Sequence, residues 1–307
     1  MYGNPCCPPR ELPSCMSHLA DAQLQERKCP GLGNEMDRRS SLKSLAALSL
    51  WGCGCGLGCR SAPYTGRSQL IFVPEQQEVS LGQTAFAEVL EKEKLTQNVR
   101  FQQIVERVGM RIAGVSGRTD YQWETKVIAA ETQNAFCLPG GKIVVYEGIL
   151  PVCQSEAGLA VVMSHEVAHV LARHGGERMS QSAAVNGAQS LVGFVMRNQE
   201  QVKKDLAMRV YGLGSQYGIL LPYSRKHELE ADKIGIMLMA QAGYDPSEAP
   251  RFWERFGAAS AGAKPAEFLS THPSDARRAT DLEQQLPQAL QFYASSANQI
   301  GLGETII

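Results

Sequence analysis

The sequence predicts an α+β fold that is mostly helical, with a small β-sheet beside one buried helix. Apolar side chains recur at helical spacing in segments 81–95 and 98–115. They alternate with polar ones in 121–130, and 142–146 is a second β-rich run, so both are predicted strands. Segment 155–173 is the most apolar predicted helix, and it carries the pattern on which the functional argument depends.

The ends of these elements follow from local chemistry. Gly114 and Gly117 are expected to end the helix 98–115, and the run Pro139-Gly140-Gly141 to turn the chain before the second strand. Glu156 suits the first turn of the helix 155–173, and Gly175-Gly176 is expected to end it. Segments 246–256 and 275–292 are predicted to close the fold as helices.

The glycine-interrupted segment 180–222 allows two interpretations. It contains helix-forming runs broken by five glycines, and it precedes the next predicted helix. It is either a mobile lid over a cleft or a set of helices packed into the bundle.

The central helix carries the run His165-Glu166-Val167-Ala168-His169. Residues four apart share one helix face, so the two imidazoles can hold one metal ion, and Glu166 can reach a water bound to it. Imidazole and carboxylate groups are costly in an apolar helix unless they are paired or ligated. On these residues alone, packing of the histidines in the core without a metal remains the alternative.

A third ligand is available downstream. Ser224 can cap a helix whose first turns carry Glu228 and Asp232 on one face. A catalytic zinc ion needs three protein ligands and one open position, which Glu228 would complete. Asp232 could then accept the ring N–H of a ligating histidine. Glu230 lies roughly 200° round the helix from Glu228 and is not expected to face the metal. A solvated charged helix face is the alternative.

Composition limits the other classes of function. The length of 307 residues allows one large domain or two small ones. The net charge is −1, and 44% of the residues are hydrophobic. Neither a basic patch nor an acidic tract is present, so no nucleic-acid partner is expected.

Seven of the nine cysteines precede residue 60, in a segment rich in proline and glycine. Residues 1–35 are not expected to form a core, and they are either an over-extended reading frame before Met36 or a real cysteine-rich extension. A basic stretch, 36–43, and a short apolar run, 45–57, then predict a secretory signal peptide over 36–59. If the body is exported, Cys137 and Cys153 either form a disulfide or are two buried free thiols.

Five ordered motifs between residues 59 and 286 resemble one family. Two of them are the His165–His169 motif and the S-R-x-x-E-x-E-A-D-x-x-G pattern of 224–235. The other three are the segments Asn134-Ala135-Phe136-Cys137-Leu138-Pro139-Gly140-Gly141, Thr271-His272-Pro273 with Arg278, and Thr65-Gly66-Arg67-Ser68-Gln69-Leu70. Together they resemble the gluzincin zinc metallopeptidases that include HtpX, BepA, LoiP and the CAAX prenyl proteases. The resemblance is greatest to the bacterial lipoprotein branch and its mitochondrial inner-membrane relatives.

This resemblance implies a zincin-type domain and a set of site residues. It implies one Zn²⁺ per chain, held by His165, His169 and Glu228, with Glu166 as general base. His272 is expected to stabilise the oxyanion or to close the site as a fourth ligand, and Arg278 to belong to the same site. Both could instead be structural, at a helix start and in a surface ion pair. Asn134, Ala135 and Phe136 are expected to bind an extended substrate through a strand edge.

The resemblance also implies a location. Cys59 has the lipoprotein spacing to Thr65-Gly66-Arg67, with Cys53 as the alternative lipidated cysteine, so a periplasmic protein anchored to the outer membrane by lipid is expected. The predicted organisation is an extension 1–35, a signal peptide 36–59, a linker 60–80, a metallopeptidase domain 81–292 and a tail 293–307.

The predicted function is zinc-dependent endopeptidase cleavage of unfolded or misassembled envelope proteins. The first alternative is a zinc-stabilised chaperone or assembly factor for outer-membrane proteins, with that assembly machinery as a partner and little proteolysis. The second is an exopeptidase for small peptides, for which no motif that would hold a free terminus is recognisable.

Overall fold

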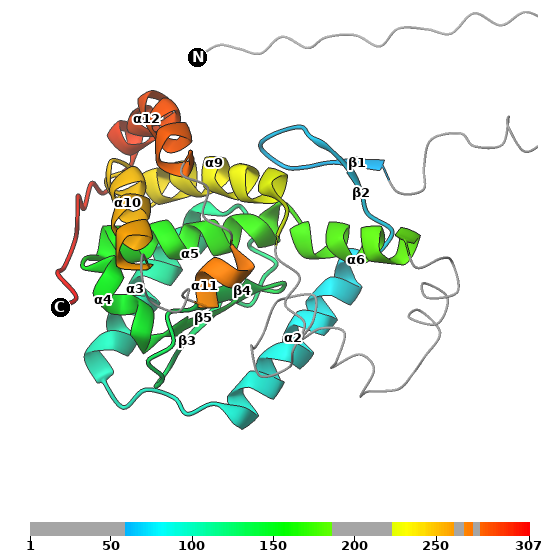
Figure 1. Ribbon diagram of the computed structural model, residues 1–307, viewed down its shortest axis with the longest axis horizontal. Helices are drawn as coiled ribbons and strands as arrows, with labels where there is room; N and C mark the ends of the chain where they lie inside the picture. The colour runs from blue at the N-terminus through cyan, green and yellow to red at the C-terminus, as the bar shows by residue number, and fades with distance from the viewer. Residues whose placement is uncertain (1–58, 186–222, 261–266, 273–276) are drawn as a thin grey trace, which may run out of the picture. The chain divides into compact units, whose positions relative to one another are not determined.

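The computed structural model describes residues 59–185, 223–260, 267–272 and 277–307, which all belong to one compact unit, Cys55–Ile307 (Figure 1). The predicted α+β class is confirmed: the described residues are mostly helical and form two small sheets. The predicted extension 1–35, nearly all of the signal peptide 36–59 and most of the segment 180–222 lie outside the described residues.

The larger sheet has three strands, β3 (Glu124–Ile128), β4 (Ala135–Leu138) and β5 (Lys142–Tyr146), in the order β3-β5-β4. The central strand β5 runs parallel to β3 and antiparallel to β4, with Val144 opposite Phe136. Gly140 and Gly141 form the β4–β5 turn with φ of 90° and 86°, a conformation that favours glycine. Strand β4 is therefore an edge strand of the described sheet.

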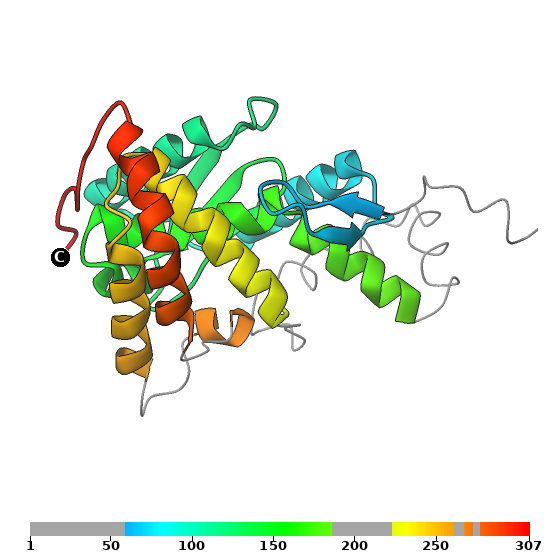
Figure 2. The same cartoon turned by 90° about the horizontal axis from the view of Figure 1, so that it is seen from above.

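Helix α5 (Glu156–Leu171) lies at the centre of the unit, and all of its residues are buried. It begins where the Ser155 hydroxyl accepts a hydrogen bond from the Gly158 amide at 3.2 Å. It packs against β4, against α3 (Val99–Val115) and, most extensively, against α9 (Arg225–Gln241). Figures 1 and 2 both show α9 lying along α5.

The remaining helices enclose this core. Helices α10 (Glu248–Ser260) and α12 (Arg278–Ser295) pack against each other, and α12 also packs against α9. The others are α2 (Glu75–Lys92), the 3-10 turn η1 (Glu147–Ile149), α4 (Leu150–Cys153), α6 (His174–Val185) and α11 (Glu267–Thr271). Among the described residues, no helix is both long and apolar enough to cross a membrane.

The predicted end of the central helix is wrong. Gly175 and Gly176 lie inside α6, while α5 ends at Leu171 and the chain is bent by Arg173, whose φ is 55°. Buried Arg173 is held in this left-handed conformation by hydrogen bonds to the Val73 carbonyl and to Glu78. A Cβ at Gly176 would lie 2.2 Å from that Glu78 carboxylate, so this glycine makes room for the ion pair.

Segment 60–80 is structured, although it was expected to be a linker. It contains β1 (Cys59–Ser61) and β2 (Ser68–Leu70), which pair antiparallel, followed by the start of α2. The expected tail is also ordered at its end: Ile306 is buried, and its amide donates to the Gln154 carbonyl at 2.8 Å. Cys137 and Cys153 are buried free thiols, so the disulfide alternative is wrong.

The contact between α5 and α9 depends on Gly235. A Cβ at this position would lie 3.1 Å from the His165 backbone nitrogen, and neither helix backbone can move away easily. We expect Gly235→Ala to lower the free energy of unfolding by about 1–3 kcal/mol through overpacking. Urea unfolding measures this, with Gly114→Ala as control, because nothing lies within 4 Å of a Cβ there. Equal stability of the two variants would contradict the prediction.

Candidate metal centre and active site

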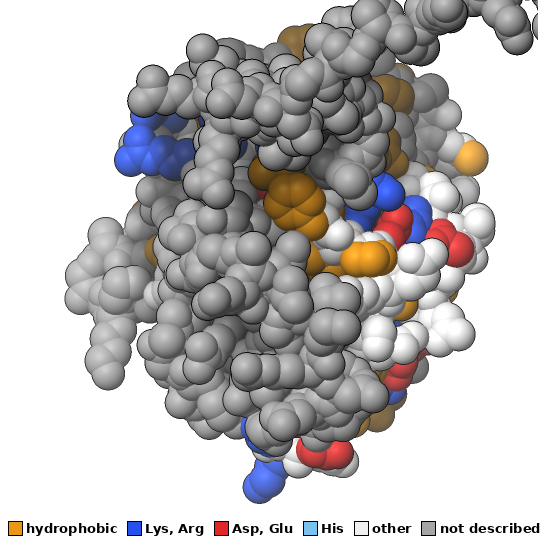
Figure 3. Space-filling view, turned by 90° about the vertical axis from the view of Figure 1, so that its right-hand side faces the viewer, with side chains coloured by type: hydrophobic (Ala, Val, Ile, Leu, Met, Phe, Trp, Pro, Cys, Tyr) orange, Lys and Arg blue, Asp and Glu red, His pale blue; other side chains and the backbone are white. Residues whose placement is uncertain are grey.

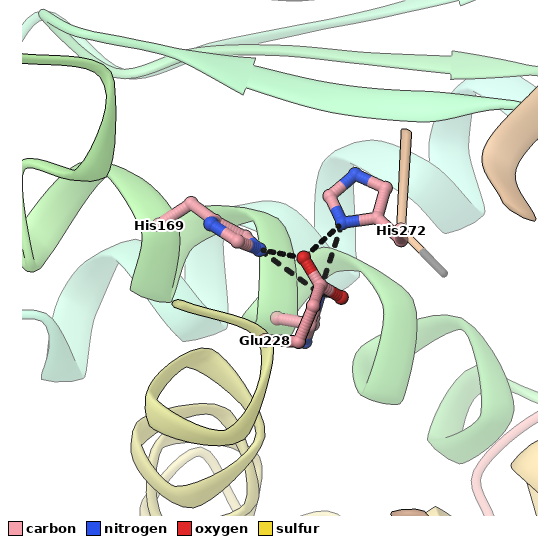
Figure 4. A group of neighbouring side chains, drawn as sticks. His169, Glu228 and His272 are labelled. Atoms are coloured by element: carbon pink, nitrogen blue, oxygen red, sulfur yellow. Dashed lines mark hydrogen bonds and ion pairs between the residues drawn. The ribbon is translucent and has the colours of Figure 1, made fainter. Parts of the chain in front are cut away.

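Three segments that are distant in the sequence bring four side chains together. His165 and His169 project from one face of α5, and Glu228 lies in the first turn of α9. His272 follows directly after α11. Figure 4 shows His169, Glu228 and His272 pointing toward one another. All four side chains are buried, and they offer ligand atoms within 4.8 Å of one another.

The predicted cap positions Glu228. The Ser224 hydroxyl accepts a hydrogen bond from the His227 amide at 3.3 Å, so α9 begins at Arg225 and its first turn faces the histidines. The Glu228 carboxylate oxygens lie 3.4 Å from Nε2 of both His165 and His169. His272 Nδ1 lies 3.2 Å from Glu228 and 3.3 Å from His165 Nε2.

These distances fit a zinc ion. Ligand atoms of a tetrahedral site with bonds of about 2.0–2.2 Å lie roughly 3.3–3.6 Å apart. The two Nε2 atoms of His165 and His169 face each other at 3.0 Å, beside the buried carboxylate of Glu228. A cation bound between two imidazole nitrogens and a carboxylate would satisfy all three of these buried groups at once. The residues therefore fit the predicted Zn²⁺.

Asp232 and Arg278 support this centre from one side. Asp232 Oδ1 lies 3.0 Å from His165 Nδ1, so the carboxylate can accept that N–H and leave Nε2 free for the metal. The Arg278 guanidinium is 1% exposed and donates to Asp232 at 2.6 and 2.8 Å, and its Nη1 lies 3.1 Å from Glu228. It also lies over the Trp253 ring at 3.5 Å. The surface ion pair that was the alternative for Arg278 is wrong.

The same contacts explain the charge of both carboxylates. Burial alone would raise the pKa of Asp232, but Arg278 and His165 outweigh it and lower that pKa below its usual value. Burial likewise opposes ionisation of Glu228, and its neighbours His272 and His165 lower the pKa well below the usual range. Both groups are therefore anionic, as a site for a divalent cation requires.

We expect Asp232→Ala to weaken zinc binding about 10–100-fold, because His165 loses the acceptor that fixes its tautomer. Competition with a fluorescent zinc chelator measures the dissociation constant, and Asp232→Asn provides a variant of unchanged shape. Asp120→Ala is the control: Asp120 pairs with Arg118, outside the metal centre. Unchanged zinc affinity in both Asp232 variants would rule out the supporting role.

Glu166 lies beside the metal-facing groups but is not one of them. It is 3% exposed, its Oε1 has no hydrogen-bond partner, and this atom lies 3.3 Å from His272 Nε2. Burial raises the pKa of Glu166 to about 7. A carboxylate with a pKa near neutrality can both accept and return a proton, as the predicted general base must.

A small pocket opens from Glu166 toward the edge of the sheet. The three predicted substrate residues line it, together with residues of both flanking segments: Asn134, Ala135, Phe136, Cys137, Glu166, Tyr223, Thr271 and His272. The His272 ring is stacked between Phe268 and Tyr223, with ring centroids 4.6 and 5.3 Å away. The pocket therefore joins the predicted base to the predicted strand edge.

Sequence reasoning missed part of this environment. His174 lies five residues after His169, a spacing that places it off the metal-facing side of a regular helix. Instead it is fully buried, its Nδ1 lies 2.9 Å from His169 Nδ1, and burial lowers its pKa to about 4. Trp253 and Tyr223, which contact Arg278 and His272, carried no signal in the sequence. The bend at Arg173 is what turns His174 back toward the centre.

Comparison with known proteins identifies the class. Residues 97–286 match Peptidase family M48, and this range contains the metal-facing residues, Glu166 and Arg278. The chain therefore belongs to peptidase family M48. This confirms the predicted gluzincin resemblance and the predicted class of enzyme, a zinc-dependent metallopeptidase.

Particular relatives are similar over different shares of the chain. "Mitochondrial metalloendopeptidase OMA1" of Schizosaccharomyces pombe is 46% identical over 186 residues, which cover 60% of this chain and 53% of that protein. The protein of the same name from Saccharomyces cerevisiae is 31% identical over 298 residues, 85% of this chain and 82% of the relative. "Beta-barrel assembly-enhancing protease" of Escherichia coli is 26% identical over 238 residues, 74% of this chain and 49% of the relative.

These relatives correct the predicted location. Relatives from two yeasts, a plant and human are named as mitochondrial, so the predicted periplasmic, lipid-anchored localisation is wrong. The predicted bacterial lipoprotein branch is not supported by these relatives. The lipidation of Cys59 or Cys53 was predicted from the same export to the periplasm, so it is no longer supported. Cys59 begins β1, opposite Leu70, and Cys53 lies outside the described residues.

Proposed function

We propose that this chain is a zinc-dependent endopeptidase that cleaves unfolded or misassembled proteins in mitochondria, with Glu166 as general base. The observation that carries the proposal is the position of Glu166 between the metal-facing group and the edge strand β4. The relatives support it by their names, as metalloendopeptidases of mitochondria.

His165, His169 and Glu228 would hold the zinc ion, which when bound lowers the pKa of a water ligand and stabilises negative charge on oxygen. Glu166 takes the proton from the attacking water and returns it to the leaving amine. The burial that raises the pKa of Glu166 toward neutrality suits both transfers. Exclusion of water from this buried site strengthens the electrostatic interactions within it.

Strand β4 supplies a surface for an extended substrate. The Tyr146 amide donates to the Asn134 carbonyl at 3.0 Å, so by alternation the backbone groups of Ala135 and Cys137 point away from β5. The Asn134 side chain already accepts from the Ala135 amide at 2.9 Å. The carbonyl groups of Ala135 and Cys137 are then available to a substrate strand, because the Cys137 amide already hydrogen-bonds to Glu166. Backbone pairing tolerates many sequences, which suits cleavage of unfolded chains.

His272 is positioned to influence the rate of catalysis. Its Nδ1 lies at ligand distance from His165 Nε2 and Glu228, in the corner that a catalytic site keeps open for water. We therefore favour the predicted closing role over oxyanion stabilisation. We expect His272→Ala to raise the turnover number several-fold on an unfolded substrate while the protein still binds one zinc ion. A fall in turnover would instead support oxyanion stabilisation, and an unchanged rate would exclude both roles.

Cleavage of an unfolded protein tests the proposed function. The full chain should cleave casein in the presence of zinc, and a chelator should abolish cleavage until zinc is restored. Internal fragments identified by mass spectrometry distinguish an endopeptidase from an exopeptidase. A zinc-loaded protein that leaves casein intact but suppresses its aggregation would instead support the alternative, an assembly factor with little proteolysis.

A further inference from the structure

The second metal-facing histidine has a partner that none of the sequence motifs assigned. His169 Nδ1 lies 2.9 Å from His174 Nδ1, and His174 Nε2 lies 3.1 Å from Glu230 Oε2. His174 is fully buried, and Glu230 is 6% exposed. The two contacts form a continuous chain from the metal centre to a carboxylate on the side of α9 opposite Glu228.

The far end of this chain is held by the β1–β2 hairpin. Arg67, directly before β2, donates from Nε to Glu230 at 2.6 Å, and the Thr65 hydroxyl also donates to this carboxylate. The other Arg67 nitrogens bind Glu177 of α6 in a bidentate pair at 2.6 and 2.8 Å. Figure 1 shows the hairpin next to α6 and the start of α9. Figure 3 views this side of the molecule, where acidic and basic side chains lie next to one another.

These contacts determine which nitrogens carry protons. Glu230 paired with Arg67 is an acceptor, so the His174 nitrogen that faces it must be N–H. A neutral imidazole carries one N–H, so His174 Nδ1 is then an acceptor, and the facing His169 Nδ1 must donate. That leaves His169 Nε2 without a proton, and this is the atom that faces His165 and Glu228.

We propose that Glu230 and Arg67 are positioning residues for the metal centre, which act on His169 through His174. The β1–β2 hairpin then supports the metal centre through Arg67, although the hairpin lies outside the residues matched to the family. The arrangement supports His169 as Asp232 supports His165, where one carboxylate accepts the ring N–H directly. Because the Arg67 side chain is 25% exposed, replacing Arg67 removes this contact to Glu230 without creating a cavity in the core.

The inference rests on His169 as a metal ligand, and zinc affinity of the full chain tests it. We expect His174→Phe and Glu230→Gln each to raise the zinc dissociation constant about 10–100-fold in chelator competition. Arg67→Ala should act in the same direction. His174→Asn keeps an acceptor near the place of Nδ1 and should retain more affinity than His174→Phe. Cobalt(II) substitution adds a second readout, because altered ligand geometry changes the visible absorption bands.

Two controls separate positioning from general stability. Arg107 binds Glu156 at the start of α5 and Glu304 in the C-terminal segment, so Arg107→Ala removes a comparable ion-pair group away from the centre. It should leave zinc affinity and the cobalt spectrum unchanged. His169→Ala should lose zinc; if it does not, the ligand assignment is wrong and the inference falls with it. If His169→Ala loses zinc but Glu230→Gln and Arg67→Ala bind it normally, the positioning role alone is refuted.

Discussion

Replacing Glu166 by Gln is expected to lower the rate of peptide cleavage by about 10²–10⁴-fold, the usual contribution of a general base. The amide keeps the shape of the side chain but cannot accept a proton from water. Glu166 is not among the grouped metal-facing side chains, so zinc affinity should stay within a few-fold. Turnover on casein and zinc competition in the same preparation separate these two effects.

The matched control is Glu156→Gln, on the same helix but at its far end, where the carboxylate binds Arg107. It should leave turnover unchanged. If Glu166→Gln retains more than a tenth of the wild-type rate, another group accepts the proton and the proposed mechanism is wrong. If it loses zinc together with activity, Glu166 has a structural role in the centre instead.

The second large effect is expected at Arg278. Its side chain is almost completely buried, and it pairs with Asp232 and Glu228 while lying over Trp253. Removing one partner of a buried ion pair leaves uncompensated charge and typically costs about 3–5 kcal/mol. We therefore expect Arg278→Met to lower the free energy of unfolding of the zinc-free protein by about that amount, measured by urea denaturation.

Two further variants test the reason for this loss. Arg278→Lys keeps the charge but loses the bidentate and stacked geometry, so it should recover only part of the stability. Arg107→Met removes an arginine that is 40% exposed, and such surface pairs contribute only about 0–1 kcal/mol. Equal losses from Arg278→Met and Arg107→Met would contradict the account of a buried charge network.

The site was predictable where its chemistry is local. His165 and His169 share a face because they are four residues apart, and Ser224, Glu228 and Asp232 share one helix start. The β5 bounds were also predicted, because the turn at Gly140-Gly141 marks where the strand begins. Short-range periodicity was sufficient for these elements.

The supporting network was not predictable in this way. Arg67, His174 and Glu230 meet only because the chain bends at Arg173 and α9 returns beside α5. Gly175-Gly176 misled the prediction, since a glycine pair is typical of a helix end but here Gly176 accommodates Glu78. The motif Thr65–Leu70 could have indicated part of this network. Its charged residue Arg67 had no predicted role, and such a residue is often paired with an acidic residue elsewhere in the fold.

The predicted localisation was wrong because two kinds of targeting signal have similar compositions. The basic stretch 36–43 and the apolar run after it are typical of a secretory signal. Arginine and serine, which occur together at Arg38-Arg39-Ser40-Ser41, are also typical of mitochondrial transit peptides. Composition alone does not separate these two signals, whereas similarity across the folded domain favours the mitochondrial relatives.

The most direct test of the central claim is a crystal structure of the full chain with zinc, with anomalous diffraction measured on both sides of the zinc absorption edge. We expect one strong anomalous peak per chain, about 2.0–2.2 Å from His165 Nε2, His169 Nε2 and a Glu228 carboxylate oxygen. A zinc peak elsewhere, or a protein that binds no zinc while these side chains keep their positions, would contradict the assignment of the metal centre.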